Sequence, residues 1–377
     1  MRVAIIGQGY VGTELGKAAQ RVGHDVVGID INYARLESLI DIGYQTSSAF
    51  SEISNSDIVV LTVPTPLDEN RKPDLSFIEQ ACDSMNPYLK DGALIINEST
   101  SYPGTLRDLI SKKLGESRLY ASAPERVDPG NLRWTIETTP RLLGALSQEA
   151  LELAYKFYKT MTDEIVLVSS PEVAEAAKLF ENTFRQVNIA LVNEFAQIAN
   201  ALKIPTIETI EAAATKPYGF MKFLPGIGVG GHCIPIDPSY LSYKASQVGI
   251  RAKFINLAND VNLDMPYYVA RKIDEVYSIR GKRVQVAGIS YKENVSDIRE
   301  SPALVLINEL RDKGALVTWH DDHVKSYRDE VSQPIHEVNL GIICVGHAAT
   351  NYSKWLNSGT TIIDVSSTPN TGFAKFL

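Results

Sequence analysis

The sequence predicts an α/β fold in which two Rossmann-like, parallel-sheet domains are joined by a long central helix. Two observations predict it. The first third and the last quarter of the chain alternate short apolar runs, typical of buried strands, with amphipathic stretches typical of helices. Between them, residues 171–203 contain no glycine and no proline after Pro171, which predicts one helix of roughly 50 Å.

Each outer part supplies a series of expected strands. In the N-terminal part these are Val3–Ile6, Val26–Asp30, Ile58–Val63, Ala93–Asn97, Leu119–Ser122 and Glu164–Val168. In the C-terminal part they are Arg283–Ile289, Leu316–His320, Leu340–Val345 and Thr361–Val365, with a helix beginning at Ser301-Pro302. A second helical region is expected at about residues 240–279. We therefore expect three domains, formed by residues 1–170, 171–279 and 280–377.

Composition restricts the class of protein. Of 377 residues, 44% are hydrophobic and 22% are charged, and the net charge of -8 argues against binding to nucleic acid. No apolar stretch reaches 18 residues and Met1 leads directly into the first strand, so we expect no membrane span and no signal peptide. The widely spaced Cys82, Cys233 and Cys344 show no metal-ligand pattern, so we expect no metal and a reducing, cytoplasmic location.

A dinucleotide-binding motif occupies the turn between the first strand and the first helix. Its members are Gly7, Gly9, Tyr10, Val11 and Gly12. The first glycine permits a tight turn, the second lets a pyrophosphate approach the backbone, and the third allows the helix to pack on the strand. Asp30 ends the next strand, where a carboxylate binds ribose hydroxyls and repels a 2′-phosphate, so the expected cofactor is NAD. The alternative is a glycine-rich turn with a surface aspartate.

Two further strand ends are expected beside the cofactor. Val63-Pro-Thr-Pro66 ends the third strand and Glu98-Ser-Thr100 ends the fourth. Because ligands bind at the carboxyl ends of parallel strands, Thr65, Ser99 and Thr100 are candidates to touch NAD or a catalytic water. The alternative role of these residues is turn chemistry and helix capping.

A glycine-rich loop that ends in a cysteine is the candidate for covalent chemistry. Four of the six residues that begin with Gly226 are glycines, Gly230 among them, and they lead to Cys233. Such a backbone allows close approach of a ligand, and a thiol beside an NAD site can attack an aldehyde, giving a thiohemiacetal and then a thioester. The alternative is a structural cysteine, with His232 as a hydrogen-bonding loop residue. Asp237 is equally suited to cap a helix.

The long central helix presents a face of hydrogen-bond donors. Lys178, Asn182 and Arg185 are spaced i, i+4 and i+7, which places them on one side of the helix. These three side chains, with no acid among them, suit an alkoxide, a thiohemiacetal oxyanion or a phosphate. The alternative is an ordinary solvated face. A helix of this length also predicts a homodimer formed through it.

Together these motifs resemble those of the UDP-glucose/GDP-mannose dehydrogenase family, and the resemblance covers essentially the whole chain. The matching segments are Gly-x-Gly-Tyr-Val-Gly from residue 7, Val63-Pro-Thr-Pro66, Ser99-Thr100, Pro124-Glu125-Arg126, Lys178 with Asn182, Gly230-Gly-His-Cys233 and residues 291–302. The resemblance implies that C6 of a nucleotide sugar is oxidised twice and that two NAD are consumed.

The resemblance also implies a role for each site residue. The cysteine of the glycine-rich loop is the nucleophile, and Lys178 and Asn182 stabilise its oxyanion. Asp237 is the acid–base group for water. Glu125 and Thr100 order that water and the C6 hydroxyl.

In the same way, the resemblance makes Lys292 a substrate ligand and Arg299 a residue that reaches the NAD pyrophosphate. Arg185, Gly226 and Gly230 are further candidates to contact the substrate. Around Ile236 the sequence is more similar to the UDP-N-acetylglucosamine 6-dehydrogenase branch than to the UDP-glucose branch, which usually has lysine there. The alternatives are a UDP-glucose 6-dehydrogenase and, more distantly, a one-step hydroxyacid-type dehydrogenase or a non-catalytic nucleotide-sugar binder.

Overall fold

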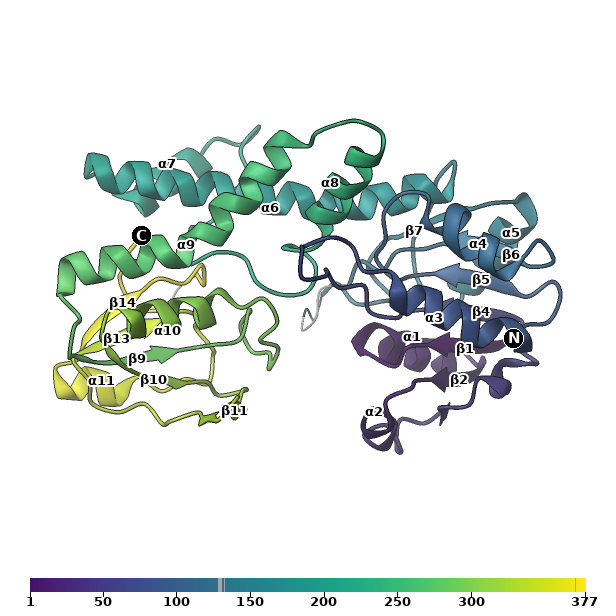
Figure 1. Cartoon of the computed structure of the whole chain (residues 1–377), viewed down its shortest axis with the longest axis horizontal. Helices are drawn as coiled ribbons and strands as arrows, with labels where there is room; N and C mark the ends of the chain where they lie inside the picture. Colours follow the sequence, from purple (N-terminus) through teal and green to yellow (C-terminus); the bar gives the residue numbers. More distant parts are fainter. Residues whose placement is uncertain (128–130, 132, 370) are drawn as a thin grey trace. The chain divides into compact units, whose positions relative to one another are not determined.

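The computed structural model describes residues 1–127, 131, 133–369 and 371–377 (Figure 1). By its internal contacts the chain divides into two compact units. Unit 1 is Met1–Glu181 with Ser239–Arg251, and unit 2 is Asn182–Pro238 with Ala252–Leu377. The α/β fold and the long helix, α6 (Pro171–Leu202), are confirmed. The division into three domains remains a prediction.

Unit 1 is built on one twisted sheet whose strand order is β3-β2-β1-β4-β5-β6-β7-β8. The strands are β1 (Arg2–Ile6), β2 (Asp25–Ile29), β3 (Gln45–Ser47), β4 (Ile58–Leu61), β5 (Leu94–Asn97), β6 (Leu119–Ser122), β7 (Arg141–Ala145) and β8 (Ile165–Leu167). The sequence did not predict β3 or β7. β7 runs antiparallel to β6, so the expectation of parallel strands alone is wrong at this position. An antiparallel neighbour needs no crossover helix, and the residues described between these two strands form none.

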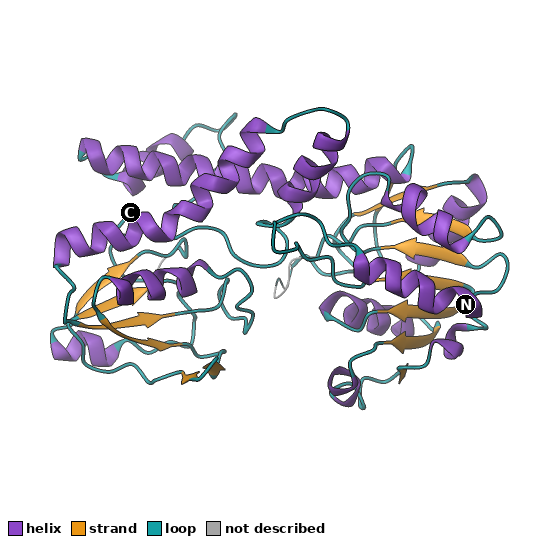
Figure 2. Cartoon of the chain, viewed as in Figure 1, coloured by secondary structure: helices purple, strands orange, loops and turns teal. Residues whose placement is uncertain are grey.

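Helices flank the sheet of unit 1 (Figure 2). They are α1 (Tyr10–Arg21), α2 (Tyr33–Glu37), η1 (Phe50–Ile53), α3 (Ser76–Met85), η2 (Asn86–Tyr88), η3 (Leu106–Ile110), α4 (Ser111–Leu114) and α5 (Gln148–Tyr158). Every residue of β4 and β5 is buried, as is usual for parallel strands covered on both faces. Because both faces are buried, these two strands consist of continuous apolar residues, and the sequence predicted them for that reason.

Unit 2 contains a smaller parallel sheet of order β10-β9-β13-β14. Its strands are β9 (Arg283–Ala287), β10 (Leu316–His320), β13 (Leu340–Ile343) and β14 (Thr361–Asp364), with a hairpin of β11 (Ser326–Tyr327) and β12 (Glu330–Val331). Among the described residues, the other helices are α7 (Thr206–Ala214), α8 (Asp237–Gln247), α9 (Lys253–Tyr277), α10 (Pro302–Asp312) and α11 (Ser353–Ser358). The helical region expected at 240–279 is thus two helices. Gly249 ends the first with φ of +78°, a conformation that favours glycine.

Candidate active site

The glycine turn after β1 has the backbone shape that a pyrophosphate requires. Gly7 has φ of +96°, and a Cβ there would lie 2.8 Å from the Thr62 carbonyl oxygen. A Cβ at Gly12 would lie 2.0 Å from the Gly7 carbonyl oxygen, so α1 can pack here only with glycine. Beside Gly9, no described atom lies within 4 Å of the corresponding Cβ position. The N-terminus of α1, which begins at the half-exposed Tyr10, is therefore open to an anion.

Asp30 follows β2 and is oriented by two backbone donors. Its Oδ2 accepts a hydrogen bond from Gln8 N at 2.7 Å, and its Oδ1 accepts one from Asn32 N at 2.8 Å. The first bond ties the carboxylate directly to the glycine motif. Because a carboxylate has about four lone-pair positions, two remain for the hydroxyls of a ribose. This geometry fits the ribose-binding role expected from the sequence.

Replacing Asp30 with asparagine should weaken NADH binding roughly tenfold, because a hydrogen bond to a charged group contributes about 1.5–3 kcal/mol. The preference for NADH over NADPH should narrow as the negative charge is removed. Fluorescence titration with both reduced cofactors measures the two effects. Asp25→Asn, at the exposed start of the same strand, is the matched control. Unchanged affinity for both cofactors in Asp30→Asn would remove this residue from the site.

The carboxyl ends of β4, β5 and β6 place the other N-terminal candidates along one edge. β5 pairs with β6 in parallel with Asn97 opposite Ser122, so Thr100 and Glu125 each follow that pair by three residues. Glu125 is buried, and its backbone N donates to the Glu98 carbonyl oxygen at 3.3 Å. Thr100 is half-buried. The two side chains therefore belong to adjacent loops at the edge where ligands bind in such sheets.

Thr65 and Ser99 occupy the loops after β4 and β5. The Ser99 hydroxyl donates to the Val63 carbonyl oxygen at 2.9 Å, and the side chain is buried. This bond connects the two loops and matches the structural role that the sequence left open for Ser99. Thr65 is half-buried in its loop. Contact of either residue with NAD remains a prediction.

A buried ion pair beneath these loops was not anticipated. Arg141 Nη1 lies 2.8 Å from Glu98 Oε1, and the Tyr158 hydroxyl donates to the same oxygen at 2.5 Å. The guanidinium also stacks 4.5 Å from the centre of the Tyr158 ring. Burial raises the pKa of the Glu98 carboxyl, and the charge of Arg141 opposes that rise. Glu98 follows β5 directly, so this pair supports the loops that carry Thr100 and Glu125.

The donor face of α6 is partly buried. Lys178 and Asn182 are buried, one helical turn apart, whereas Arg185 is exposed. The three side chains lie on one side of the helix, as expected, but two are buried and the third is exposed to solvent. Buried donors suit a developing oxyanion, and an exposed arginine suits a solvated phosphate.

The cysteine loop brings Cys233, Asp237 and Asn182 together within unit 2. Asp237 N donates to the Cys233 carbonyl oxygen at 2.8 Å, which closes the turn between them. Asp237 is buried as the first residue of α8, and its Oδ2 accepts a hydrogen bond from Asn182 Nδ2 at 2.5 Å. The aspartate therefore begins a helix and also contacts the donor face of α6. The sequence left open whether Asp237 caps a helix or activates water. Its place at the start of α8 fits the first role, and the second remains a prediction.

The glycines of this loop are required by packing against residues 291–302. A Cβ at Gly230 would lie 2.8 Å from Tyr291 Cβ, and one at Gly231 would lie 2.8 Å from the Tyr291 ring. Gly226 N donates to Asn193 Oδ1 at 2.9 Å. The close approaches that these glycines permit are thus to protein atoms. Contacts of Gly226 and Gly230 with substrate remain predictions.

The segment that carries Lys292 and Arg299 lies against the cysteine loop. Gly231 N donates to the Arg299 carbonyl oxygen at 2.9 Å. The Arg299 guanidinium pairs with Asp297, and its Nη2 lies 3.0 Å from His232 Nδ1. Lys292 is half-buried. His232 and Asp297 were not among the predicted site residues, and the only sequence signal for His232 was its position next to Cys233.

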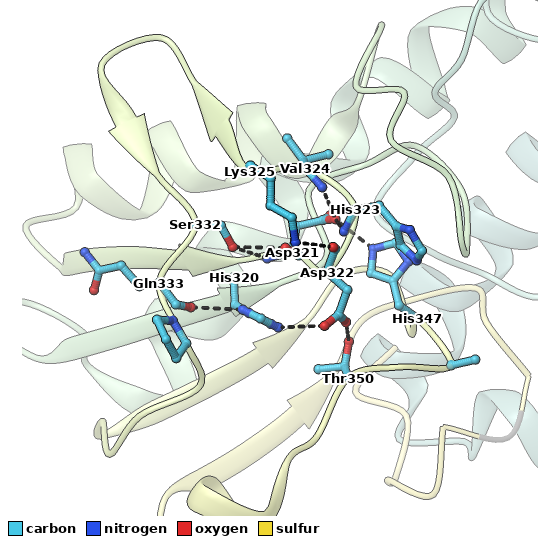
Figure 3. A network of polar contacts seen from close by, with 12 residues as sticks. His320, Asp321, Asp322, His323, Val324, Lys325, Ser332, Gln333, His347 and Thr350 are labelled. Carbon is cyan, nitrogen blue, oxygen red and sulfur yellow. Dashed lines mark hydrogen bonds and ion pairs between the residues drawn. The ribbon is translucent and has the colours of Figure 1, made fainter. Parts of the chain in front are cut away.

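A buried carboxylate anchors the start of that segment. Asp321, directly after β10, accepts hydrogen bonds from Ile289 N at 2.8 Å and Ser290 N at 3.1 Å, in the loop after β9. His347 Nε2 lies 3.0 Å from the same carboxylate, and both side chains are buried (Figure 3). Asp30 makes the corresponding contact in unit 1. The two sheets therefore hold the loop after their first strand in the same way.

The other two cysteines are not candidates for catalysis. Cys82, in α3, and Cys344, after β13, are free and buried, and burial raises the pKa of the Cys82 thiol to about 12. Within the described part of the chain, no three His, Cys, Asp or Glu side chains are grouped so that they could bind a metal. In that same part, no helix is long and apolar enough to span a membrane.

The fold and the glycine turn define a class of protein, the NAD-dependent dehydrogenases, and comparison with known proteins identifies the family. The NAD binding domain of the UDP-glucose/GDP-mannose dehydrogenase family matches residues 1–44 and 41–162. The family's central domain matches residues 172–264, and its UDP binding domain matches residues 285–367. The chain belongs to this family, and it is an NAD-dependent oxidoreductase.

Individual relatives agree with this assignment. The chain is 35% identical to a UDP-N-acetyl-D-mannosamine dehydrogenase of Methanocaldococcus jannaschii, over 86% of this chain and 80% of that protein. It is 33% identical to a UDP-N-acetyl-D-glucosamine 6-dehydrogenase of Pseudomonas aeruginosa, over 95% and 92% of the two chains. The solved structure of a UDP-D-ManNAc dehydrogenase from Pyrococcus horikoshii superposes with a TM-score of 0.85 at 31% identity, covering 97% of this chain and 95% of that one.

Proposed function

We propose that this protein oxidises C6 of a UDP-N-acetylhexosamine twice, from CH2OH to carboxylate, through a thioester on Cys233. Family membership supports the nucleotide sugar, because the C-terminal part of the chain matches a UDP binding domain. The observation that carries the chemistry is the closed turn from Cys233 to Asp237, with Asn182 bound to the aspartate. These contacts support a site in which Cys233 is the nucleophile, Asp237 the acid–base group and Asn182 an amide donor.

In the proposed reaction, bound NAD supplies the hydride acceptor for both oxidations. The first oxidation converts the C6 alcohol to an aldehyde, and the hydroxyl proton passes to the water molecule that Thr100 and Glu125 order. The Cys233 thiolate then adds to the aldehyde carbon, which forms the C–S bond and an oxyanion. Lys178 and Asn182 donate hydrogen bonds to that oxyanion, and their burial strengthens the interaction.

Loss of the second hydride converts the thiohemiacetal to a thioester, and hydrolysis completes the reaction. Asp237 takes one proton from water, the hydroxide adds to the thioester carbon, and the C–S bond breaks to release the thiolate and the carboxylic acid, whose proton is lost to solvent. We assign substrate binding to Arg185, Lys292 and the backbone at Gly226 and Gly230. Arg299 is proposed to reach the NAD pyrophosphate.

The identity of the sugar is tested by supplying UDP-N-acetylglucosamine, UDP-N-acetylmannosamine and UDP-glucose with NAD. The sequence around Ile236 favours the glucosamine epimer, and the Methanocaldococcus jannaschii relative favours the mannosamine epimer. We expect one of the two N-acetylhexosamines to be oxidised with two NADH formed per acid. One NADH per sugar would instead support a one-step dehydrogenase, and faster oxidation of UDP-glucose would reassign the substrate.

We further propose that the protein is a homodimer formed through α6. Phe184, Leu191, Ile198 and Leu202 are between 43% and 64% exposed and follow one another at spacings of seven, seven and four residues. This spacing places them in a single apolar stripe along the helix. A stripe of this kind is typical of a surface that another protein covers, and a second copy of the same helix is self-complementary to it.

The double substitution Leu191→Glu with Ile198→Glu should convert the dimer to a monomer, because facing glutamates would repel and lose apolar burial. Sedimentation equilibrium should then give about half the mass of the unmodified protein. Val331→Glu, at a similarly exposed apolar position on β12, should leave the mass unchanged. An unmodified protein that sediments as a monomer would refute the dimer directly.

A further inference from the structure

His347 joins the loops that follow β9 and β13, the two central strands of the smaller sheet. Its Nδ1 accepts a hydrogen bond from Asn294 N at 2.9 Å, and its Nε2 lies 3.0 Å from Asp321 Oδ2. We propose that His347 is a positioning residue, which fixes the segment that carries Lys292 for binding of the nucleotide sugar. This inference rests on the proposed function and deepens it, because it names what holds a substrate ligand in place.

The partners of His347 define which of its ring nitrogens carries the proton. A backbone N–H can only donate, so the Nδ1 that faces Asn294 N has no hydrogen. Nε2 therefore carries the proton and donates it to Asp321, with Ser290 Oγ as a longer contact at 3.3 Å. The histidine and the aspartate are both buried (Figure 3). One neutral imidazole thus acts as a donor to one loop and as an acceptor for another.

The chain is held on both sides of Lys292. Before it, Ser290 Oγ donates to the Lys292 carbonyl oxygen at 2.8 Å. After it, Asn294 Oδ1 accepts a hydrogen bond from Ala348 N at 3.0 Å, so residues 294 and 347–348 are joined by two hydrogen bonds. Asn294 has φ of +58°, a conformation that asparagine tolerates better than most residues. Because His347 contacts both Ser290 and Asn294, it restricts the backbone at Lys292 from both directions.

Asp321 supports this arrangement and is saturated by protein donors. Its carboxylate accepts two hydrogen bonds from the loop after β9, one from His347, and one each from His323 N and Val324 N at 2.9 Å. A carboxylate has only about four lone-pair positions. Asp321 therefore holds protein groups in place, whereas Asp30 in unit 1 keeps room for a ribose.

The order of the strands places His347 where ligands bind in sheets of this kind. From β9 the chain continues to β10 on one side, and β13 pairs with β9 on the other. Ligands bind beyond the carboxyl ends of the strands at the position where the strand order reverses. The loops after β9 and β13 meet at that position, and they are the two loops that His347 joins.

Hydrogen exchange in the ligand-free protein tests the contact directly. His347→Gln keeps an amide donor near the position of Nε2 but removes the acceptor at Nδ1. The Asn294 amide should then exchange roughly fivefold faster or more, as expected for loss of one hydrogen bond. The amides of β9 should exchange as before, which separates local release from global unfolding. His347→Asn places an oxygen near the position of Nδ1 and should restore slow exchange. Mass spectrometry of fragmented peptides measures these rates.

A double-mutant cycle on ligand affinity tests whether the contact serves Lys292. In the otherwise unmodified protein, Lys292→Ala should lower the affinity for a UDP-N-acetylhexosamine roughly tenfold, as expected for loss of a hydrogen bond from a charged group. In the His347→Gln background it should lower the affinity by less than about threefold, because the lysine is no longer held in place. Calorimetric titration with UDP-N-acetylglucosamine and UDP-N-acetylmannosamine measures these affinities.

Two further variants keep the test decisive. Asn294→Gly removes the acceptor for Ala348 N at an exposed position and accepts the left-handed φ, so it should fold and should also weaken sugar binding. His336→Gln removes a half-buried histidine that contacts the Pro334 carbonyl oxygen, and it should behave as the unmodified protein in both measurements.

Slow exchange at Asn294 in a folded His347→Gln, or additive losses of affinity in the cycle, overturns the inference. If His347→Gln fails to fold, unmodified affinity in Asn294→Gly overturns it instead. Unmodified affinity in Lys292→Ala alone would remove Lys292 from the proposed function, whereas faster exchange at Asn294 in His347→Gln would still support the positioning of the loop.

Discussion

Replacing Cys233 with alanine should reduce formation of the sugar acid by roughly a thousandfold or more, because the covalent intermediate cannot form. Binding of NADH should be unchanged, since Gly7, Gly12 and Asp30 keep their geometry in unit 1. Product acid is measured by chromatography and cofactor binding by fluorescence. Cys82→Ala, which removes a buried thiol from α3, is the matched control and should keep its activity. Unchanged turnover in Cys233→Ala would remove the cysteine from the mechanism.

Cys233→Ser separates the two halves of the same mechanism. A serine oxygen can occupy the position of the sulfur and form an ester, but an ester hydrolyses more slowly than a thioester. We therefore expect the acylated protein to accumulate, with an added mass equal to that of the nucleotide-sugar acid less one water. Intact-protein mass spectrometry after incubation with substrate and NAD detects it. Absence of the adduct while acid is still formed would argue against covalent catalysis at this position.

Replacing Arg141 with methionine should lower the free energy of unfolding of unit 1 by about 3–5 kcal/mol, because it leaves the Glu98 carboxyl buried without its cation. In a domain of this size, the midpoint of thermal unfolding should fall by roughly 6–20 °C. Calorimetry measures the shift. Arg107→Met, which breaks a half-exposed ion pair with Glu172, should change the free energy by less than about 1 kcal/mol.

The decrease in the free energy of unfolding caused by Arg141→Met should also depend on pH. Burial already raises the pKa of Glu98, and removal of the positive charge should raise it further. The folded state then holds a proton that the unfolded state releases above its ordinary carboxyl pKa, so rising pH favours unfolding. The difference in the free energy of unfolding between the unmodified protein and Arg141→Met should be larger at pH 8 than at pH 5. The double variant Arg141→Met with Glu98→Gln should recover part of the stability, and an equal deficit at both pH values would contradict this account.

Elements with strong local signals were predicted well. The ends of β1, β4, β5 and β6 agree with the expected strands to within two residues, because strands buried on both faces are continuous apolar runs. The polar, three-residue β3 has no such pattern and was missed. β7 was missed because it begins with the charged Arg141, which looks like a loop residue until its partner Glu98 is known.

The candidate site shows the same distinction. Gly7 and Gly12 were identified from the sequence because their role is set by the local backbone, through φ at the first and packing on the turn at the second. Cys233 was predicted to be the nucleophile from its neighbouring glycines and the expected NAD site, and that role remains a prediction. His232 was interpreted as an ordinary loop residue because the groups that contact it, Arg299 and Asp297, are more than 60 positions away in the chain.

The sequence by itself determined the α/β class and the long helix, and it predicted the NAD turn and the nucleophilic thiol. These depend on short periodic patterns and on residues adjacent in the chain. Only the tertiary structure decided which side chains contact one another. Asn182 contacts Asp237, Asp297 lies near His232, and Arg141 pairs with Glu98. Each of these contacts joins segments far apart in sequence, and a charge acquires its effect from burial and partners that no local pattern records.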